Sequence, residues 1–286
     1  MTRSDVLLLL QHPPVYTFGK RLNADAELRR KREREREREG HGVKNREREA
    51  MLEEMSDIVG GLSRDALASV SGADVVDVGR GGQVTFHGPG QCIFYPIVNL
   101  RRRVGIRSPS GPGTDTEEGG SKGIGRIGAR AFVESLESAL IAASVAAGVS
   151  NATSLSHQGS PGVYVPYEVS RNTTEPNKAS PSSYRKLGSV GVKVSQGVTS
   201  HGAALNVSTD LRYFEWIVSC GAADVKQTSI MHELNKHQRA SDYERGVDMR
   251  GIENAFVCKL QQLLAYDCVE EIDACQLGLH HTSIVG

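Results

Sequence analysis

Short apolar runs bounded by proline and glycine predict a chain rich in β-strands. The run Val6–Leu10 is stopped by Pro13 and Pro14, after which Val15–Phe18 resumes as a short extended piece. Apolar and β-branched runs of this length, between turn residues, are typical of buried strands. The same pattern predicts strands at Asp74–Val78, Cys92–Leu100, Gly162–Val165, Gly191–Val194 and Ala203–Val207. Pro96 indicates an edge or a bulge in its strand, because proline lacks the amide hydrogen that a central ladder uses.

Two segments instead repeat their apolar residues at helical spacing. Between Ile127 and Ala147 the apolar positions fall on one helical face, and Gly148 is well placed to end that helix. A second stripe runs from Ile252 to Leu264. The fold class we expect is therefore α+β: a single domain over residues 1–286 with a mixed sheet flanked by helices.

Polar stretches interrupt these elements. Residues 29–54 alternate arginine and glutamate, and this spacing places like charges four residues apart, where helical pairing partly cancels itself. The neutralised charge argues against a nucleic-acid arm. We expect disordered segments or loop insertions at residues 29–54, 101–122, 166–183 and 232–246, which a compact core tolerates.

Composition and charge narrow the function further. The formal net charge of the 286 residues is zero, so no global field favours nucleic acid or an acidic membrane. The apolar run near the start is too short to span a bilayer. The five cysteines form no Cys-x-x-Cys pair, which argues against a zinc ribbon or a thioredoxin-type motif and fits a reducing compartment.

Two motif-like stretches lack the context that their chemistry requires. Gly123–Gly128 matches G-x-G-x-x-G but follows a polar loop and has no acidic residue about twenty positions on, so we reject a dinucleotide site. His232 and His237 are five residues apart, whereas a zinc-binding helix needs a spacing of four. No Walker-type phosphate loop is present.

The stretch Gly79–Gly90 is the first candidate for a site. Its glycines let the backbone approach a ligand closely, Arg80 can hold an anion, and His87 can donate or accept a hydrogen bond. The alternative is a hairpin that uses glycine only for its turns. His12, beside Pro13, poses the same choice between a functional and a structural role.

The stretch Lys186–Cys220 is the second candidate. A cysteine thiol has a pKa near 8.5, so a nucleophilic cysteine needs a nearby cation or base. Lys186 can activate Cys220 in this way, and His201 is the rival partner because Cys–His pairs are commoner in general. The residues alone leave that choice open.

Four segments together resemble the lipoyl(octanoyl) transferases. They are RGGQVTFHGPGQCIFYPIVNL (80–100), GVYV (162–165), KLGSVGVKVSQGVTSHGAALNV (186–207) and SCGAADVKQTSI (219–230), and LLLLQHPPVYTFGKR (7–21) is similar to the family's early strand. The resemblance implies the fold shared by biotin- and lipoate-protein ligases. It also implies transfer of octanoyl from octanoyl-acyl carrier protein to a lysine on the lipoyl domains of 2-oxoacid dehydrogenase complexes and on the glycine cleavage H protein.

The resemblance also assigns roles. It makes Cys220 the nucleophile that carries the acyl thioester and Lys186 the group that activates it, and it places His201 in the pocket wall. The substrate-contacting segments that it implies are Arg80, Gly81, Gly82, Gln83, Val84, Thr85, Phe86 and His87; Ser189, Val190 and Gly191; and Gly202, Ala203 and Ala204. A thioester is already activated, so we expect no cofactor and no metal. The zero net charge and the short apolar run lead us to expect no nucleic-acid partner and no membrane partner.

The chain departs from the family pattern at three places. Ser219 stands where the family usually has proline, and Phe86 replaces a frequent tyrosine. The chain begins almost at its first strand, whereas the family usually has a helix and a strand before it, and two explanations stay open: the sequence is truncated, or the protein lacks part of the domain. Two other hypotheses remain: an ATP-dependent lipoate- or biotin-type protein ligase, and a non-catalytic lipoyl-domain binder. The compartment we expect is the mitochondrion, with the cytoplasm as the alternative.

Overall fold

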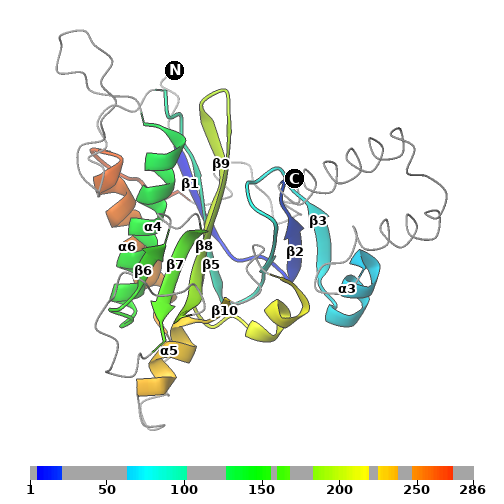
Figure 1. The fold of residues 1–286 in the computed structure, drawn as a ribbon. Coiled ribbons are helices and arrows are strands. Elements are labelled where there is room, and N and C mark those ends of the chain that lie inside the picture. Colours follow the sequence, from blue (N-terminus) through cyan, green and yellow to red (C-terminus); the bar gives the residue numbers. More distant parts are fainter. Residues whose placement is uncertain are drawn as a thin grey trace, which may run out of the picture.

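The computed structural model describes residues 5–20, 63–101, 127–155, 160–167, 183–218, 225–237 and 247–272. Their strands form two sheets (Figure 1). The large sheet has the order β1-β5-β9-β8-β7-β6, and β10 pairs with β8 in parallel. The bounds are β1 Val6–Leu10, β5 Gln91–Ile97, β6 Thr153–Leu155, β7 Ser160–Pro166, β8 Tyr184–Ser195, β9 Val198–Asn206 and β10 Lys226–Gln227.

The small sheet has the order β3-β2-β4, with β2 at Val15–Phe18, β3 at Asp74–Asp77 and β4 at Val84–His87. The helix α3 (Arg64–Ser71) and the 3-10 helix η4 (Leu211–Trp216) pack with it. Tyr16, Phe18 and Phe86 are almost completely buried in this cluster. The small sheet therefore has an aromatic core of its own, separate from that of the large sheet.

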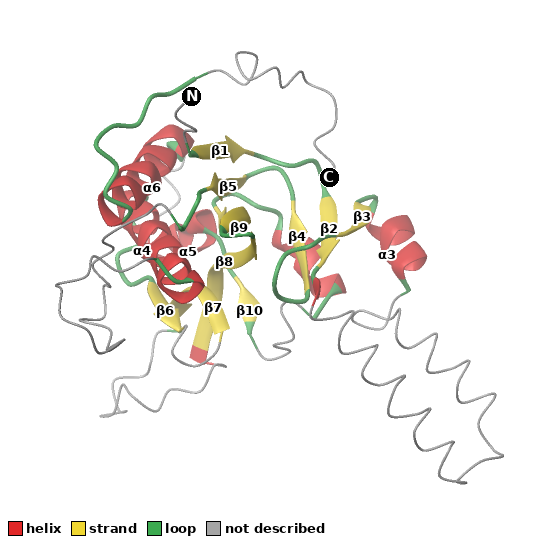
Figure 2. Ribbon diagram, turned by 90° about the horizontal axis from the view of Figure 1, so that it is seen from above, coloured by secondary structure: helices red, strands yellow, loops and turns green. Residues whose placement is uncertain are grey.

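The helices α4 (Ala129–Ala146) and α6 (Met249–Leu263) lie side by side over one face of the large sheet, away from the small sheet (Figure 2). Leu136 and Leu140 of α4, Phe256 of α6 and Leu205 of β9 belong to one apolar cluster. The rings of Phe94 and Phe256 stack at 3.7 Å between centroids. Burial of this face anchors the strands, and the opposite face is turned toward the small sheet (Figure 1).

These elements confirm the predicted strands and both predicted helices. Gly148, with φ of 94°, follows α4 as expected for a left-handed residue that ends a helix. Pro96 lies in an interior strand rather than an edge strand, but the ladder between β5 and β9 covers only Gln91–Phe94. Beyond it, the Thr199 hydroxyl donates to the Pro96 carbonyl at 2.6 Å and accepts from the Val98 amide at 2.9 Å. The edge position predicted for Pro96 was therefore wrong, whereas the predicted irregularity in its strand is present.

One predicted insertion was partly wrong. Residues 230–237 form the helix α5 (Ile230–His237), whereas we expected an insertion from residue 232. The helix is anchored by Ile230 and Glu233, both of which are buried. Residues 29–54, 102–122, 168–182 and 238–246 lie outside the described residues. At the two described ends of the 166–183 segment, the Tyr167 amide donates to the Ser183 carbonyl at 2.8 Å. The elements α3, η4, β6 and β10 were not predicted.

Candidate active site

Lys186 reaches the inner face of the large sheet because β8 carries a bulge. Tyr164 of β7 pairs with Lys186, but its neighbour Val163 pairs with Gly188, so Leu187 is an extra residue in β8. Leu187 points into the core beneath the helices together with Val163. A bulge changes the face that the following side chains occupy. Lys186 and Tyr164 therefore lie on the opposite face, toward the small sheet.

The surroundings of the Lys186 side chain are closely packed. Lys186 is 3% exposed, its Nζ donates to the Pro161 carbonyl at 3.2 Å, and the Tyr164 ring centroid lies 5.3 Å from that nitrogen. Gly162 has a φ of 140°, and a Cβ there would lie 2.9 Å from Lys186 Cε. Its amide donates to the buried Glu137 of α4 at 2.6 Å. Glycine is therefore required where β7 passes the lysine.

A buried ion pair holds the strand beside Lys186. Arg185 donates through two nitrogens to the carboxylate of Glu233 in α5, at 2.8 and 2.7 Å. Thr228, next to β10, also donates to that carboxylate, and its amide donates to the Lys186 carbonyl at 2.8 Å. Burial acts to raise the pKa of Glu233, but the hydrogen bonds from Arg185 and Thr228 outweigh it and lower the pKa to about 2.

The Gly79–Gly90 stretch joins the two sheets. The Arg80 guanidinium donates to the Thr17 carbonyl at 2.6 Å and to the Thr17 hydroxyl at 2.9 Å. The Gly81 amide donates to the Val192 carbonyl of β8 at 3.2 Å. A Cβ at Gly191 would lie 3.3 Å from Arg80 Cδ, so a larger side chain there would crowd the loop. These contacts give Arg80 a definite structural role between β2 and β8.

Three histidines and a tyrosine gather beside Arg80. His12 Nε2 lies 2.8 Å from the Tyr95 hydroxyl, and its ring centroid is 5.8 Å from that of His87. His201, with φ of 58°, meets the Tyr95 ring edge-on at 6.2 Å. Burial, together with nearby positive charge, lowers the pKa of His87 to about 3; burial also lowers the pKa of His12 and His201. The cluster is therefore a set of neutral imidazoles, which donate and accept hydrogen bonds without carrying charge.

The predicted site residues divide between this inner face and the two cores. Arg80, His87 and His201 come together at the inner face, and Lys186 lies on the same face beside Gly162 and Tyr164 of β7. Ser189 and Gly191 of β8 lie opposite Ala204 and Gly202 of β9 there. The alternate residues Val190 and Ala203 pack toward the helices. Val84 and Phe86 point into the core of the small sheet, while Thr85 and Gln83 lie within or next to β4. Cys220 lies outside the described residues, as does Ser219.

Sequence reasoning missed four polar residues that complete the face: Gln91, Tyr95, Asn206 and Thr228. All but Tyr95 are almost completely buried. Gln91, Asn206 and Thr228 stand in the segments that carried the family resemblance, and a polar residue within such a segment is a usable signal. The contact of Thr228 with Glu233 could not be foreseen, because it depends on α5, which was not predicted.

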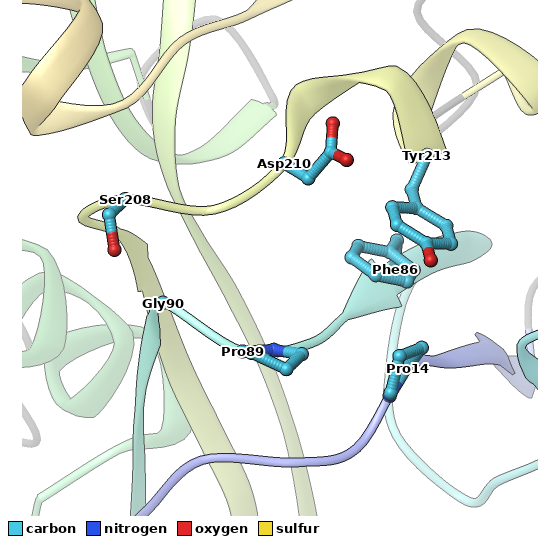
Figure 3. A pocket seen from close by; sticks show the side chains of 7 residues that line it. All are labelled: Pro14, Phe86, Pro89, Gly90, Ser208, Asp210 and Tyr213. Carbon is cyan, nitrogen blue, oxygen red and sulfur yellow. The ribbon is translucent and has the colours of Figure 1, made fainter.

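A hollow of about 400 Å³ lies on the Phe86 side of β4, between the turn that follows β4 and the 3-10 helix η4 (Figure 3). Phe86 and Tyr213 stack at 4.3 Å along one wall, and Asp210 and Pro89 lie at its rim. Of the predicted site residues, Phe86 alone lines it. The hollow and the Lys186 face are therefore separate features.

Within the described ranges, no group of three or more histidine, cysteine, aspartate or glutamate side chains could hold a metal ion. None of the helices in those ranges is long and apolar enough to cross a membrane.

Comparison with known proteins relates this geometry to a family. Residues 121–261 match the lipoyl protein ligase A/B catalytic domain. The chain is 34% identical to the octanoyltransferase of Acidobacterium capsulatum over 230 residues, which cover 80% of this chain and 68% of that relative. It is also 34% identical to the mitochondrial octanoyltransferase of Arabidopsis thaliana over 231 residues, covering 81% and 66%.

Two further matches complete the comparison. The octanoyltransferase of Corynebacterium aurimucosum is 31% identical over 85% of this chain and 65% of its own length, so the chain spans about two thirds of the relatives that it matches. A bipartite lipoate protein ligase from Thermoplasma acidophilum superposes with a TM-score of 0.47 and 13% identity, over 99% of this chain and 88% of that one. The sequence identity over most of the chain shows that it belongs to the octanoyltransferase family.

Proposed function

We propose that the chain transfers an octanoyl group from octanoyl-acyl carrier protein to a lysine of lipoyl domains, through a thioester on Cys220. The observation that carries the proposal is the bulge at Leu187, which turns a buried lysine out of the apolar core and onto the polar face between the sheets. A lysine buried for structural reasons alone has no need of such a bulge. Bulges next to functional sites commonly re-aim one side chain in this way.

The first half-reaction forms the acyl-enzyme. Lys186 accepts the proton of the Cys220 thiol, and the thiolate attacks the carbonyl carbon of the octanoyl thioester. A carbon–sulfur bond to Cys220 forms, the bond to the carrier breaks, and the carrier thiolate takes the proton back from Lys186. Backbone amides beside the nucleophile stabilise the oxyanion.

The second half-reaction transfers the acyl group to nitrogen. The neutral amine of the acceptor lysine attacks the Cys220 thioester, the carbon–nitrogen bond forms, and the Cys220 thiolate leaves. One amine proton reaches Cys220 by way of Lys186, which restores the thiol. The reaction balances with no nucleotide and no metal, because the donor thioester is already activated.

The other described cysteines support this choice of nucleophile. Cys92 is fully buried, and burial raises the pKa of its thiol to about 12, so it stays protonated. Cys258 and Cys268 are exposed, and the helix α6, which carries Cys258, covers the opposite face of the large sheet. The family motif associates Cys220, and none of these three cysteines, with Lys186.

The rival function is an ATP-dependent ligase, since the matched catalytic domain is named for lipoyl protein ligases. The test supplies a purified lipoyl domain with octanoyl-acyl carrier protein alone, or with free octanoate and ATP. We expect amide formation in the first mixture only. Modification of the lipoyl domain in the second mixture alone would establish the ligase, and modification in neither would point to the non-catalytic binder.

The acceptors that we propose are lipoyl domains of 2-oxoacid dehydrogenase complexes and the glycine cleavage H protein, and the compartment is the mitochondrion. A relative from Arabidopsis thaliana is named as mitochondrial, which supports the second point. Fractionation of source cells tests it: the chain should co-purify with the mitochondrial matrix, and recovery in the cytosol would contradict it.

A further inference from the structure

A continuous chain of buried hydrogen bonds leads from His87 to the strand that carries Lys186. His87 Nδ1 lies 2.7 Å from Gln91 Oε1, and Gln91 Nε2 lies 2.7 Å from Asn206 Oδ1. Asn206 Nδ2 then donates to the Thr228 carbonyl at 3.0 Å, and the Thr228 amide donates to the Lys186 carbonyl at 2.8 Å. His87, Gln91, Asn206 and Thr228 are each less than a tenth exposed.

The last hydrogen bond of this series, at the Thr228 carbonyl, determines which group donates in every other bond of the series. A carbonyl only accepts, so Asn206 must present its amide nitrogen to Thr228 and its oxygen to Gln91. Gln91 therefore donates through Nε2, which also donates to the Phe86 carbonyl at 3.3 Å, and its oxygen is left for His87. His87 must donate from Nδ1. Its proton lies on that nitrogen, and Nε2 carries the free lone pair.

The other nitrogen of His87 is available to a ligand. Within the part of the chain that the structure describes, Nε2 makes no hydrogen bond. It is also not one of the fully buried polar atoms left without a partner. Around the ring lie His12 from the segment after β1, Arg80 from the segment before β4, and His201 from β9. Because burial and the positive charge of Arg80 keep the pKa of His87 near 3, the ring stays neutral and Nε2 remains an acceptor.

We propose that His87 Nε2 accepts a hydrogen bond from the amine of the acceptor lysine, with Gln91 and Asn206 as positioning residues that hold the required tautomer. This rests on the proposed function. The acceptor amine is the reacting group that carries N–H bonds, and a fixed lone pair beside it orients the nitrogen toward the thioester carbon. No proton passes to His87; the bond forms while the amine attacks, as written above.

The test separates the two half-reactions. His87→Phe keeps the ring volume and removes the acceptor. We expect acyl-enzyme formation from octanoyl-acyl carrier protein within about threefold of wild type. Transfer from the isolated acyl-enzyme to the lipoyl domain should be slower by about 100-fold, as for loss of one hydrogen bond to a nitrogen that becomes positively charged as it attacks. His232→Phe, at an exposed position on α5, is the matched control and should match wild type in both steps.

A second variant tests the positioning residues. Gln91→Glu still accepts from His87 Nδ1 but adds a negative charge, so it raises the pKa of His87. Transfer by this variant should acquire an additional fall in rate toward acid pH, beyond the fall that protonation of the acceptor amine causes in the wild type, because a protonated imidazole cannot accept. A purely structural role for Gln91 predicts no such change in the pH profile.

Nitrogen NMR on the wild-type chain tests the tautomer without any variant in the sample. At neutral pH, the His87 signal, assigned by its loss in His87→Phe or, if that variant does not fold, in His87→Gln, should show a protonated Nδ1 and a bare Nε2. A proton on Nε2 would overturn the inference. So would transfer at the wild-type rate by a His87→Phe acyl-enzyme. Failure of the wild type to form any acyl-enzyme would instead contradict the proposed function.

Discussion

The two faces of the large sheet carry opposite kinds of side chain, although the same strands supply both. Toward α4 and α6 the strands present residues such as Phe94, Leu187 and Leu205, which pack into one apolar core. Toward the small sheet they present Gln91, Lys186 and Asn206. Gln91 bonds to Asn206, which is connected through Thr228 to the backbone carbonyl of Lys186. Strand alternation alone separates most of these residues. Lys186 reaches the polar face only because Leu187 is inserted beside it.

The two faces of the large sheet therefore make different contributions to the protein. The helix-covered face supplies stability through burial, and its residues are interchangeable as long as they fill volume. On the inner face the side chains of His87, Gln91 and Asn206 are joined by directed hydrogen bonds, so an exchange changes the direction of a bond or leaves a buried group unpaired. Substitutions on the inner face should therefore alter rate or pH dependence, and those on the helix face should alter stability alone.

The largest expected effect comes from Lys186→Met, which keeps the aliphatic stem and removes the amine. Acyl-enzyme formation should fall by about 10³-fold, since a positioned acid–base group contributes about 10²–10⁴-fold. Lys193→Met on the same strand is the control and should stay within about threefold of wild type in stopped-flow assays. Equal losses in the two variants would show that the loss is not specific to Lys186, and would contradict its role as the acid–base group.

The next effect concerns the ion pair beside the site. Arg185→Met leaves the carboxylate of Glu233, 4% exposed, without its partner and should lower the free energy of unfolding by about 3–5 kcal/mol. Arg212→Met breaks a pair in which the arginine side chain is 83% exposed and screened by solvent, so it should leave the free energy of unfolding nearly unchanged. Urea titrations at pH 7 compare them. Similar midpoints would mean that the buried pair is dispensable.

Acid pH should destabilise the inner face selectively, because that face holds neutral histidines. The pKa of His87 is near 6.5 in the unfolded chain and about 3 in the folded one, so the unfolded state binds the extra proton between these values. Stability should fall as the pH drops below 6.5. From pH 6.5 to 5 the loss from this group is about 1.5–2 kcal/mol. His12 and His201 shift in the same direction, so the difference between wild type and His87→Phe isolates the effect, and equal losses in both would contradict it.

The smallest effect is expected on the helix-covered face. Phe256→Leu removes part of the ring stacked on Phe94 and should lower the free energy of unfolding by about 1 kcal/mol. The value of kcat/KM should stay within about twofold, because the site lies across the sheet. A large loss of activity at full folding would show that the two faces are not separable.

The sequence permitted much of this arrangement to be predicted. Apolar runs located the main strands, and helical spacing located α4 and α6, because burial imposes those patterns on the chain. The family motifs pointed to Lys186, Arg80 and His87. The bulge at Leu187 could not be predicted, because a one-residue shift in the register of β8 depends on which residue of β7 each position pairs with. The helix α5 was missed because it has few apolar positions. Its buried anchor is Glu233, and a glutamate is expected to be exposed unless a partner such as Arg185 is known.

The hydrogen-bond chain illustrates the same limit. Gln91 and Asn206 are 115 residues apart, and only the pairing of β5 with β9 brings them together. Residue types predict that a buried amide needs partners but not which ones. The tautomer of His87 follows from the last link at Thr228, so it could be derived only from the folded chain.

Intact-mass spectrometry after mixing with octanoyl-acyl carrier protein, in the absence of a lipoyl domain, tests the central claim most directly. The wild-type chain should gain the mass of one octanoyl group, released by hydroxylamine, and Cys220→Ala should gain none while Cys258→Ala, at an exposed cysteine, behaves as wild type. A thioester adduct that persists in Cys220→Ala would contradict the account.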